Sequence, residues 1–296
     1  MVIRSRSNII QFRSAEIIDP GGDSYFLDDY PQALLHLSFR QMRTGQTLCY
    51  RIRRNSDNDE LDIGFVDGVV DVATAEAFCG AGNGFLSRWY GAGMGGYEAY
   101  QNTASNQPQI VSNGTHILYN DKPSAFYNGT SHNLDINDDA NLRQVSNYSI
   151  FAIAAKTTTA SGTFFAKSSG TSSGNSMYVL DTANTALRFV VWEAAGTARV
   201  CSSSGRRADV LELHEGHHIP GSPPQISRWR DGELLNSTNT IDPLFSNEAN
   251  LQIGVRGTTA RHAGYVSEVQ ITNTHNTAFN SAYRANVESY YGITMI

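Results

Sequence analysis

From about residue 148 onward, short apolar runs alternate with turns that are rich in Ser, Thr, Gly and Asn. Each run has the length of a single strand, and short strands separated by turn signals are typical of a β-sandwich. We therefore expect a mainly β protein. The runs that we expect to form strands are 148–155, 162–167, 176–180, 187–192, 210–214 and 251–255.

The apolar pattern changes its period near the C-terminus. Large apolar side chains recur there at the spacing of one helix face, and Gly292 follows them as a helix-ending residue. A shorter helix is predicted over 71–80, with Asp71 as its N-cap and Gly80 as its end. The residues that define the face of the C-terminal helix are Phe279, Tyr283, Val287 and Tyr290.

In the N-terminal third the pattern predicts one more helix and two strands. Pro31 suits a first helical position, and apolar residues follow it at roughly helical spacing up to Met42. Gly45 would end this helix. We expect the strands at 47–54 and 85–90.

Residues 1–24 have the character of a separate arm. Its arginines precede the first acidic residue, and the turn-forming segment 19–23 follows a short β-prone run. A run this short cannot bury its own apolar side chains, so it would pair either with the main domain or with a partner chain. We expect the arm to anchor the protein to neighbouring subunits. The residues that would do so are Arg4, Arg6, Ile9, Ile10, Phe12 and Arg13.

The charge balance of the 296-residue chain is 22 Lys+Arg against 28 Asp+Glu, a net charge of −6. We expect no nucleic-acid partner, because phosphate contacts need clustered cations. No apolar run approaches the ~20 residues of a membrane span, and the first residues lack the apolar run of a signal peptide. The three cysteines are scattered. We therefore expect synthesis in a cytoplasm, without a disulfide framework or membrane insertion.

The segment His214–His218 matches His-Glu-x-x-His, in which two histidines one helical turn apart bind zinc and the glutamate activates water. Gly216 and the prolines that follow disfavour a helix, and the residues before it are typical of a strand. In a strand His214 and His218 would lie ~13 Å apart, too far to share one ion. We therefore expect no metal and no cofactor.

Two other patterns have simpler interpretations. Gly91–Gly96 matches Gly-x-Gly-x-x-Gly, but no helical pattern follows it, so we expect a glycine loop rather than a dinucleotide site. The acidic groups at 57–62 and 135–139 could supply carboxylates to calcium, but neither has EF-hand spacing, so we interpret them as solvated turns. Some aromatic residues near predicted loops, Tyr100 among them, could stack on sugars, although core packing competes with that role. The candidates for ligand binding are Trp89, Tyr90, Tyr97 and Trp229.

An ordered series of motifs runs through the N-terminal half: Asp28–Pro31, Leu37–Arg40, Tyr50–Asp57, Glu60–Phe65, Phe78–Gly80, Trp89–Tyr90 and Asn106–Ile110. The series resembles the N-terminal part of α-L-arabinofuranosidase B-type catalytic domains. It resembles still more the related domains of phage virion proteins.

Segments 251–257 and 264–272 are similar to the closing strands of a concanavalin A-like (laminin G-like) sandwich, and Tyr290–Ile293 is similar to the tail of the phage examples. The resemblance implies a jelly-roll β-sandwich with a few short helices over residues 25–296. Within it, 25–147 would form the arabinofuranosidase B-like N-terminal part, and 148–296 the sandwich core and C-terminal helix.

Two departures from the enzyme pattern count against catalysis. The arabinofuranosidases carry an acidic Asp-Gln-Ser-Gly-x-Gly-Asn-like loop where this chain has Gly91–Tyr97. They also carry a nucleophile segment like Asp-x-Glu-x-Gly-Leu-Phe, and the nearest stretch here, Leu180–Phe189, has one acid, Asp181, and no glutamate. We therefore assign no catalytic residue and expect no enzyme activity.

The resemblance implies a phage virion structural protein, a component of a tail, fibre or head surface for assembly or for attachment to host-surface glycans. It would be made in the host cytoplasm and would contact other virion proteins and further copies of itself. The alternative is a glycoside hydrolase of the arabinofuranosidase B type. A zinc hydrolase that uses His214, Glu215 and His218 is the third hypothesis.

Overall fold

The computed structural model describes most of the chain after its first residues. Residues 1–23 lie outside the described residues, and so does all of the predicted arm except Ser24. The described ranges are 24–143, 147–158, 160–168, 176–183, 186–193, 196–205, 207–240, 244–258 and 260–296.

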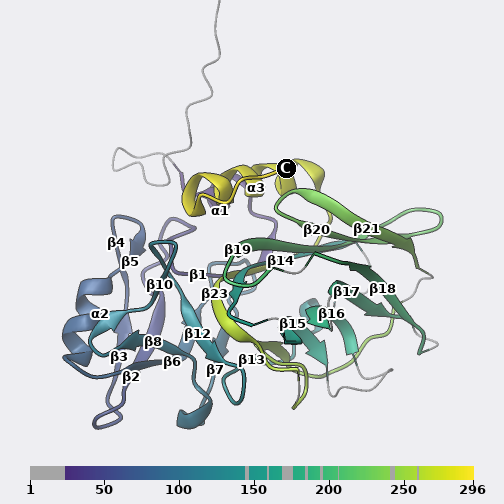
Figure 1. Ribbon diagram of the computed structural model, residues 1–296. Coiled ribbons are helices and arrows are strands. Elements are labelled where there is room, and N and C mark those ends of the chain that lie inside the picture. The colour runs from purple at the N-terminus through teal and green to yellow at the C-terminus, as the bar shows by residue number, and fades with distance from the viewer. Residues whose placement is uncertain are drawn as a thin grey trace, which may run out of the picture.

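In the described ranges, nineteen strands pair into one continuous sheet that folds into two layers (Figure 1), which confirms the mainly β sandwich. The first layer contains, in spatial order, β21 (Glu233–Asn239), β20 (Gln225–Arg230), β19 (Leu211–Ile219), β14 (Tyr148–Lys156) and β23 (Ala263–Thr272), with β1 (Ala33–Ser38) and β12 (Ala125–Asn128) on the far edge of β23. All of these pairings are antiparallel.

The second layer is also antiparallel throughout. Its strands, in spatial order, are β3 (Glu60–Ile63), β2 (Tyr50–Arg54), β6 (Gly84–Tyr90), β7 (Glu98–Tyr100), β13 (Leu134–Ile136), β22 (Leu251–Ile253), β15 (Gly162–Ser168), β16 (Ser176–Ala183), β17 (Ala186–Trp192) and β18 (Ala198–Ser203). The layers are joined by β8 (Gln109–Ser112), which pairs with β6, β12 and the short β9 (Thr115–His116).

Short elements complete the described ranges. They are the helices α1 (Phe26–Asp29), α2 (Val72–Cys79) and α3 (Thr277–Tyr291), the 3-10 turns Ala104–Asn106 and Ala140–Leu142, and the hairpins β4 (Phe65–Val66) with β5 (Val69–Val70) and β10 (Leu118–Tyr119) with β11 (Lys122–Pro123). No helix in the described part of the chain is long and apolar enough to cross a membrane.

The main hydrophobic core lies between the two layers. Successive side chains of a strand point to opposite faces, so Ile150 and Ala152 of β14 face the second layer while Phe151 and Ile153 face outward. The second layer contributes large inward side chains to the same core, among them Phe165, Leu180 and Phe189.

The outward face of the first layer is covered by α3, which lies across β14 and β19 in Figure 1. Asn276 caps its N-terminus by accepting a hydrogen bond from the Phe279 amide at 3.0 Å, and Gly292 ends it in the left-handed region at φ 67°. The predicted C-terminal helix is therefore confirmed. All four side chains that define its predicted face are buried: Phe279, Tyr283, Val287 and Tyr290.

The prediction of a helix after Pro31 is wrong. That segment forms β1, in which every side chain from Ala33 to Ser38 is buried. Leu35 and Leu37 face the core between the layers, and His36 and Ser38 lie on the face that α3 covers. A strand buried on both faces shows no alternation of apolar and polar residues, so its apolar residues also fit a helical spacing by chance.

Most other elements agree with the sequence. The helix over 71–80 is confirmed as α2, and the Asp71 carboxylate accepts a hydrogen bond from the Thr74 amide at 3.0 Å. The glycine segment 91–96 leads into the strand β7, which confirms it as a loop. Strands of 25–147 pair with strands of 148–296, since β1 and β12 pair with β23 and β13 pairs with β22.

A buried carboxylate fastens two strands of the first layer, β1 and β23, to the helix α3 that covers them. Glu268 of β23 accepts two hydrogen bonds from the Arg40 guanidinium, at 2.9 and 3.0 Å, and one from Ser38 Oγ at 2.8 Å. The hydroxyls of Tyr283 and Tyr291 on α3 donate to it at 2.7 and 2.9 Å. Although burial opposes ionisation, Arg40 and His36, whose Nε2 lies 3.0 Å from the carboxylate, hold the pKa of Glu268 well below its usual range.

Arg40→Met should lower the free energy of unfolding by about 3–5 kcal/mol, because it leaves the Glu268 carboxylate buried without its countercharge. Arg88→Met is the matched control: Arg88 pairs with Glu98 near the surface, and such pairs contribute about 1 kcal/mol or less. Urea unfolding followed by circular dichroism measures both. Equal losses for the two variants would contradict the role given to Glu268.

Candidate functional site

Each strand of the second layer contributes one residue to a row that crosses the outer face of the sheet. Residues directly opposite one another in neighbouring antiparallel strands have adjacent side chains on the same face. In order from β3 to β18 the row is Asp62, Arg51, Arg88, Tyr100, Asp135, Gln252, Ala166, Val179, Val190 and Val200. The row is polar as far as Gln252 and apolar from Ala166 onward.

The apolar part of this row is covered at Ala166, Val179 and Val190 by a later segment of the chain, and only Val200 at its end is exposed. Phe245 packs on the cluster that contains Val190 and Trp192, and its amide donates to the Trp192 carbonyl at 2.6 Å. The guanidinium of Arg256 lies 4.8 Å from the centroid of the Trp192 ring. The polar half is therefore the part of the face that a ligand can reach.

A pocket of about 380 Å³ lies at the boundary between the two halves. Its volume falls in the range of small-ligand sites. Polar side chains dominate its wall, and Ala249 and Gly257 complete it. The lining residues are Asp135, Ser168, Ala249, Asn250, Gln252, Gly257 and Thr258.

Asp135 is the charged residue of this pocket. Its two oxygens accept hydrogen bonds from neutral amides, Gln252 Nε2 at 3.1 Å and Asn133 Nδ2 at 3.2 Å. No cation of the described chain forms an ion pair with it, and burial raises the pKa of its carboxyl above the ordinary value. The carboxylate is thus held in place without being neutralised.

Other carboxylates on the same face are paired with arginine. Arg51 donates to both oxygens of Asp62, at 2.8 and 2.7 Å. Arg188 donates to both oxygens of Asp181 in the same way, at 2.9 and 2.7 Å. These side chains hold one another, and this distinguishes them from Asp135.

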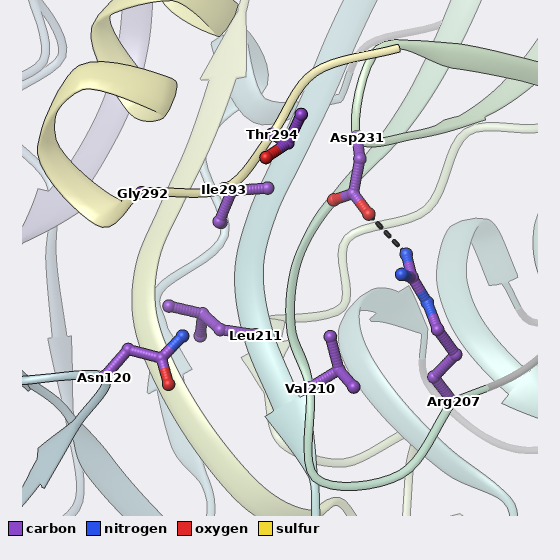
Figure 2. A pocket seen from close by; sticks show the side chains of 8 residues that line it. All are labelled: Asn120, Arg207, Val210, Leu211, Asp231, Gly292, Ile293 and Thr294. Atoms are coloured by element: carbon purple, nitrogen blue, oxygen red, sulfur yellow. Dashed lines mark hydrogen bonds and ion pairs between the residues drawn. The ribbon is translucent and has the colours of Figure 1, made fainter.

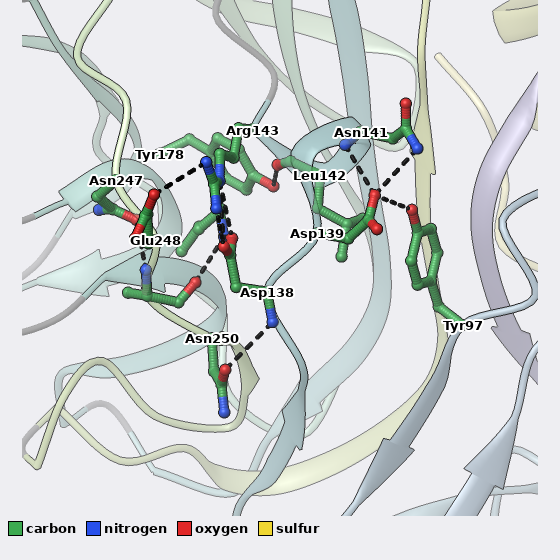
Figure 3. Close-up of polar contacts among 12 residues, drawn as sticks. Tyr97, Asp138, Asp139, Asn141, Leu142, Arg143, Tyr178, Asn247, Glu248 and Asn250 are labelled. Atoms are coloured by element: carbon green, nitrogen blue, oxygen red, sulfur yellow. Dashed lines mark hydrogen bonds and ion pairs between the residues drawn. The ribbon is translucent and has the colours of Figure 1, made fainter.

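A second polar cluster fixes the segment that forms one wall of the pocket (Figure 3). Asp138 is bonded to the Arg143 guanidinium and to the ammonium of the buried Lys167, which also donates to the Ala249 carbonyl. The Asp138 amide donates to Asn250 Oδ1 at 3.2 Å. These bonds, first of all that from Arg143, hold the pKa of Asp138 below its ordinary value. The wall is therefore positioned before any ligand binds.

The carboxylates of this face do not form the pair that glycoside hydrolysis needs. Hydrolases use two carboxyl groups roughly 5–10 Å apart. Asp135 on β13 and Asp181 on β16 are separated by three strand spacings, about 14 Å. Both oxygens of Asp138 are taken by Arg143 and Lys167. In the described residues, Asp135 is the one carboxylate of the pocket wall.

The four aromatic candidates do not share one site. Tyr90 lies on the polar face, where its hydroxyl donates to Asp62 Oδ1 at 2.7 Å. Tyr97, in the loop before β7, donates to Asp139 Oδ1 at 2.7 Å (Figure 3). Trp229 belongs to the first layer and lies on the side of α3, with the Arg284 guanidinium 4.5 Å from its ring.

Trp89 is wrong as a ligand-binding residue. Its side chain has no exposed surface, its ring stacks on Phe39 with centroids 4.6 Å apart, and its indole nitrogen donates to the Ser38 carbonyl at 3.2 Å. Trp89 and Tyr90 are neighbours in β6, so one must point inward and the other outward. The larger apolar ring takes the core position.

Sequence reasoning named Tyr100 among the aromatic residues that could stack on sugars, but it missed Asp135, Asn250 and Gln252 as site residues. Asp135 was interpreted as part of a solvated turn, but it lies in β13 between the buried residues Leu134 and Ile136. The alternation at Leu134–Ile136 was the available signal for a strand with Asp135 on its outer side. That β13 pairs with both β7 and the distant β22 could not be derived from the local pattern.

The His-Glu-x-x-His segment lies in β19, which confirms the predicted strand. His214 stacks on Phe164 at 4.2 Å and His218 on Tyr148 at 5.6 Å, both inside the sandwich. Glu215 is on the opposite face, where it accepts hydrogen bonds from Arg284. No group of three or more metal-ligating side chains is formed by the described residues.

A further pocket of about 240 Å³ lies beside the end of α3 (Figure 2). Its charged residues, Arg207 and Asp231, pair with each other, and Arg207 also pairs with the buried Glu212. Its remaining wall is formed partly by Gly292 and Ile293. We assign this pocket a structural role in holding the C-terminal segment.

Asp135→Asn should raise the melting temperature at pH 7, because it removes the cost of keeping a half-buried charge without a countercharge. Since the pKa of Asp135 is raised on folding, that cost is fully present above the folded pKa and disappears as the pH falls through it. The gain should therefore shrink in acid, as scanning calorimetry from pH 7 to pH 3 can measure. Asp181→Asn, the control, should lower the melting temperature at pH 7 because it breaks the pair with Arg188. A destabilised Asp135→Asn would contradict this assignment.

No family model matches this sequence, and no curated protein matches it. Solved structures do resemble it. A GH54 α-L-arabinofuranosidase soaked with a cyclic sulfate inhibitor superimposes with a TM-score of 0.63 at 13% identity. An arabinofuranosidase complexed with arabinofuranosyl-α-1,2-xylobiose superimposes with a TM-score of 0.65 at 12% identity.

Each of these two superpositions covers 87% of this chain and 62% of the arabinofuranosidase. The chain therefore spans about three-fifths of the length of those proteins. At this identity the likeness concerns the fold. The protein is a β-sandwich with an arabinofuranosidase-like fold.

Proposed function

We propose that the protein is a non-catalytic glycan-binding component of a phage virion, and that the pocket around Asp135 is its glycan site. The observation that carries the proposal is an accessible carboxylate that is positioned by Gln252 and Asn133 but is not neutralised. A positioned carboxylate of this kind is available to accept hydrogen bonds from a ligand. Its arginine-paired counterparts, Asp62 and Asp181, are not.

The chemistry of the pocket wall fits a sugar. Sugar hydroxyls both donate and accept hydrogen bonds, so they pair well with a carboxylate, with side-chain amides and with hydroxyls. Asp135, Gln252, Asn250 and Ser168 offer these groups together. The arabinofuranosidases that share the fold support the same ligand class, since one was solved with arabinofuranosyl-α-1,2-xylobiose.

The proposal of binding without hydrolysis rests on the missing second carboxylate. Asp135 has no partner carboxyl group in the pocket wall, and Asp138 and Asp181 are held by cations. The sequence points the same way. It lacks the acidic loop of the arabinofuranosidases at Gly91–Tyr97 and the glutamate of their nucleophile segment at Leu180–Phe189.

The virion assignment rests on the resemblance of the sequence to phage virion domains. A basic arm, residues 1–24, precedes the sandwich and would connect it to other virion proteins. In such a protein the sandwich would contact the host surface and the arm would contact the particle.

A glycoside hydrolase is the second candidate. The raised pKa of Asp135 favours it, because a general acid must hold its proton near the working pH. Hydrolysis would need a nucleophile or base as well. That group would have to come from outside the described residues, or from Asp138 after its bonds to Arg143 and Lys167 break. The two candidates differ in product: a hydrolase releases sugar, and a binding protein leaves its glycan intact.

Wild-type protein should bind glycans on an array of plant and bacterial polysaccharides, and Asp135→Ala should weaken that binding by about 10–100-fold. This factor corresponds to the loss of one or two hydrogen bonds to a charged group, each contributing about 1.5–3 kcal/mol. Asp181→Asn, whose carboxylate is paired and outside the pocket, should bind normally. Chromatography of the incubated glycans should detect no released sugar. Absence of binding, or binding that Asp135→Ala leaves intact, refutes the glycan site, and released sugar supports the hydrolase.

Deletion of residues 1–24 should leave a folded sandwich that binds glycan but no longer enters the particle. The locally positive arm, with Arg4, Arg6 and Arg13, would steer to acidic partner surfaces, and its β-prone run would complete a neighbour's sheet. Mass spectrometry of purified particles measures incorporation, and circular dichroism measures folding. Normal incorporation of the truncated protein, or its failure to fold, would contradict the role of the arm.

A further inference from the structure

The polar half of the row continues well beyond the pocket. Tyr100 of β7 lies directly opposite Asp135, and Arg88 of β6 lies directly opposite Tyr100. Arg51 of β2 then lies opposite Arg88. A line of polar and aromatic side chains thus extends from the pocket across β7, β6 and β2, perpendicular to the strands.

A second row runs beside the first on the same face. Tyr90 and Glu98 are directly opposite each other in β6 and β7. Asn137 is two residues beyond Asp135, so it follows on the same side, and its Oδ1 accepts a hydrogen bond from the Tyr100 hydroxyl at 2.6 Å. Asn250 continues this side into the pocket wall. The two rows together form a track, which we define as Arg51, Arg88, Tyr90, Glu98, Tyr100, Asp135 and Asn137.

The side chains of the track remain accessible to solvent. Arg51 and Arg88 are each 35% exposed and Glu98 is 40% exposed. By contrast, the apolar continuation of the row at Ala166 and Val190 is buried under the segment with Phe245. The track is therefore open to solvent, whereas the row is covered at Ala166, Val179 and Val190.

The two arginines of the track are both paired with carboxylates. Arg51 pairs with Asp62 and Arg88 pairs with Glu98. Such a face presents no free cation to a polyanion, so it does not suit nucleic acids or acidic polysaccharides. Paired charges, amides and phenolic hydroxyls do offer donors and acceptors to neutral hydroxyls, and tyrosine rings offer flat apolar surfaces to a sugar.

The length of the track exceeds one sugar. From Asp135 on β13 to Arg51 on β2 the track crosses three strand spacings, about 14 Å. A monosaccharide in the pocket would leave Tyr90 and Arg51 without contact. A chain of several sugars would contact both the pocket and the track.

Resting on the proposed glycan function, we infer that the ligand is an extended, uncharged polysaccharide. One segment of it occupies the Asp135 pocket, and the next sugars cross β7, β6 and β2 along the track. Tyr100 is the first contact outside the pocket because it is directly opposite Asp135. Recognition then depends on chain length as well as on the sugar in the pocket.

The test uses the full-length protein and size-fractionated oligosaccharides of one to eight sugars from arabinoxylan, galactan, glucan and mannan. Isothermal titration calorimetry should show affinity rising about tenfold or more between the disaccharide and the hexasaccharide, or 1.4 kcal/mol. Tyr100→Ala should abolish that rise and leave the disaccharide affinity within about twofold of wild type. Tyr119→Ala, in the β10 hairpin outside the track, is the control and should leave the rise intact.

Hydrogen exchange on wild-type protein gives a second readout that needs no variant. The hexasaccharide should protect β6 and β7, whereas the disaccharide should protect only the pocket segments around Asp135 and Asn250. Alginate and hyaluronan oligomers serve as acidic comparators and should bind more weakly than the neutral series.

Different failures overturn different claims. Equal affinity for short and long chains, with binding that still requires Asp135, overturns the track and leaves the glycan site standing. The track is also overturned if Tyr100→Ala loses the same factor of affinity for the disaccharide and the hexasaccharide. Tighter binding of the acidic oligomers than of the neutral ones overturns it as well. Absence of binding at every length overturns the glycan site and the track together.

Discussion

The register of the second layer is the constraint on which the site depends. Side chains alternate faces along a strand, so a slip of one residue in the pairing of β13 with β7 and β22 would turn Asp135 into the core and expose Leu134. The burial of Leu134 and Ile136 between the layers opposes that slip. The hydrophobic core therefore determines which polar side chains reach the ligand face.

Glu268 and Asp135 carry the same chemical group, a carboxylate, but their different hydrogen-bond partners give them different roles. Glu268 receives hydrogen bonds from Arg40, Ser38, Tyr283 and Tyr291, so its ionised form is stabilised and it serves to fasten α3 to the sheet. Asp135 receives only neutral amide donors and keeps the capacity to accept more bonds. The first arrangement suits a structural group, and the second suits a group that meets a ligand.

Elements whose signals lie in neighbouring residues could be predicted from the sequence. Features that depend on pairing between distant strands could not. The periodicity of α3 and the strand character of β19 could be derived from neighbouring residues, because caps, glycines and prolines act within one turn of the chain. The strand β1 could not, because burial on both faces removed its alternation. The track could not either, because Tyr100, Asp135 and Gln252 meet only when β13 pairs both with β7 and with β22, which follows β13 by more than a hundred residues.

The two outer faces of the sandwich point in opposite directions, and the described chain begins on the side away from the pocket. Ser24 precedes α1, whose Phe26 packs against Phe279 of α3 with ring centroids 5.7 Å apart (Figure 1). Copies attached to a particle through their N-terminal ends would therefore all turn outward the face for which we propose glycan binding. On a surface coated with repeating polysaccharide, attachment then becomes a matter of avidity: after the first contact, the effective concentration of neighbouring sites lets weak individual contacts hold the whole particle.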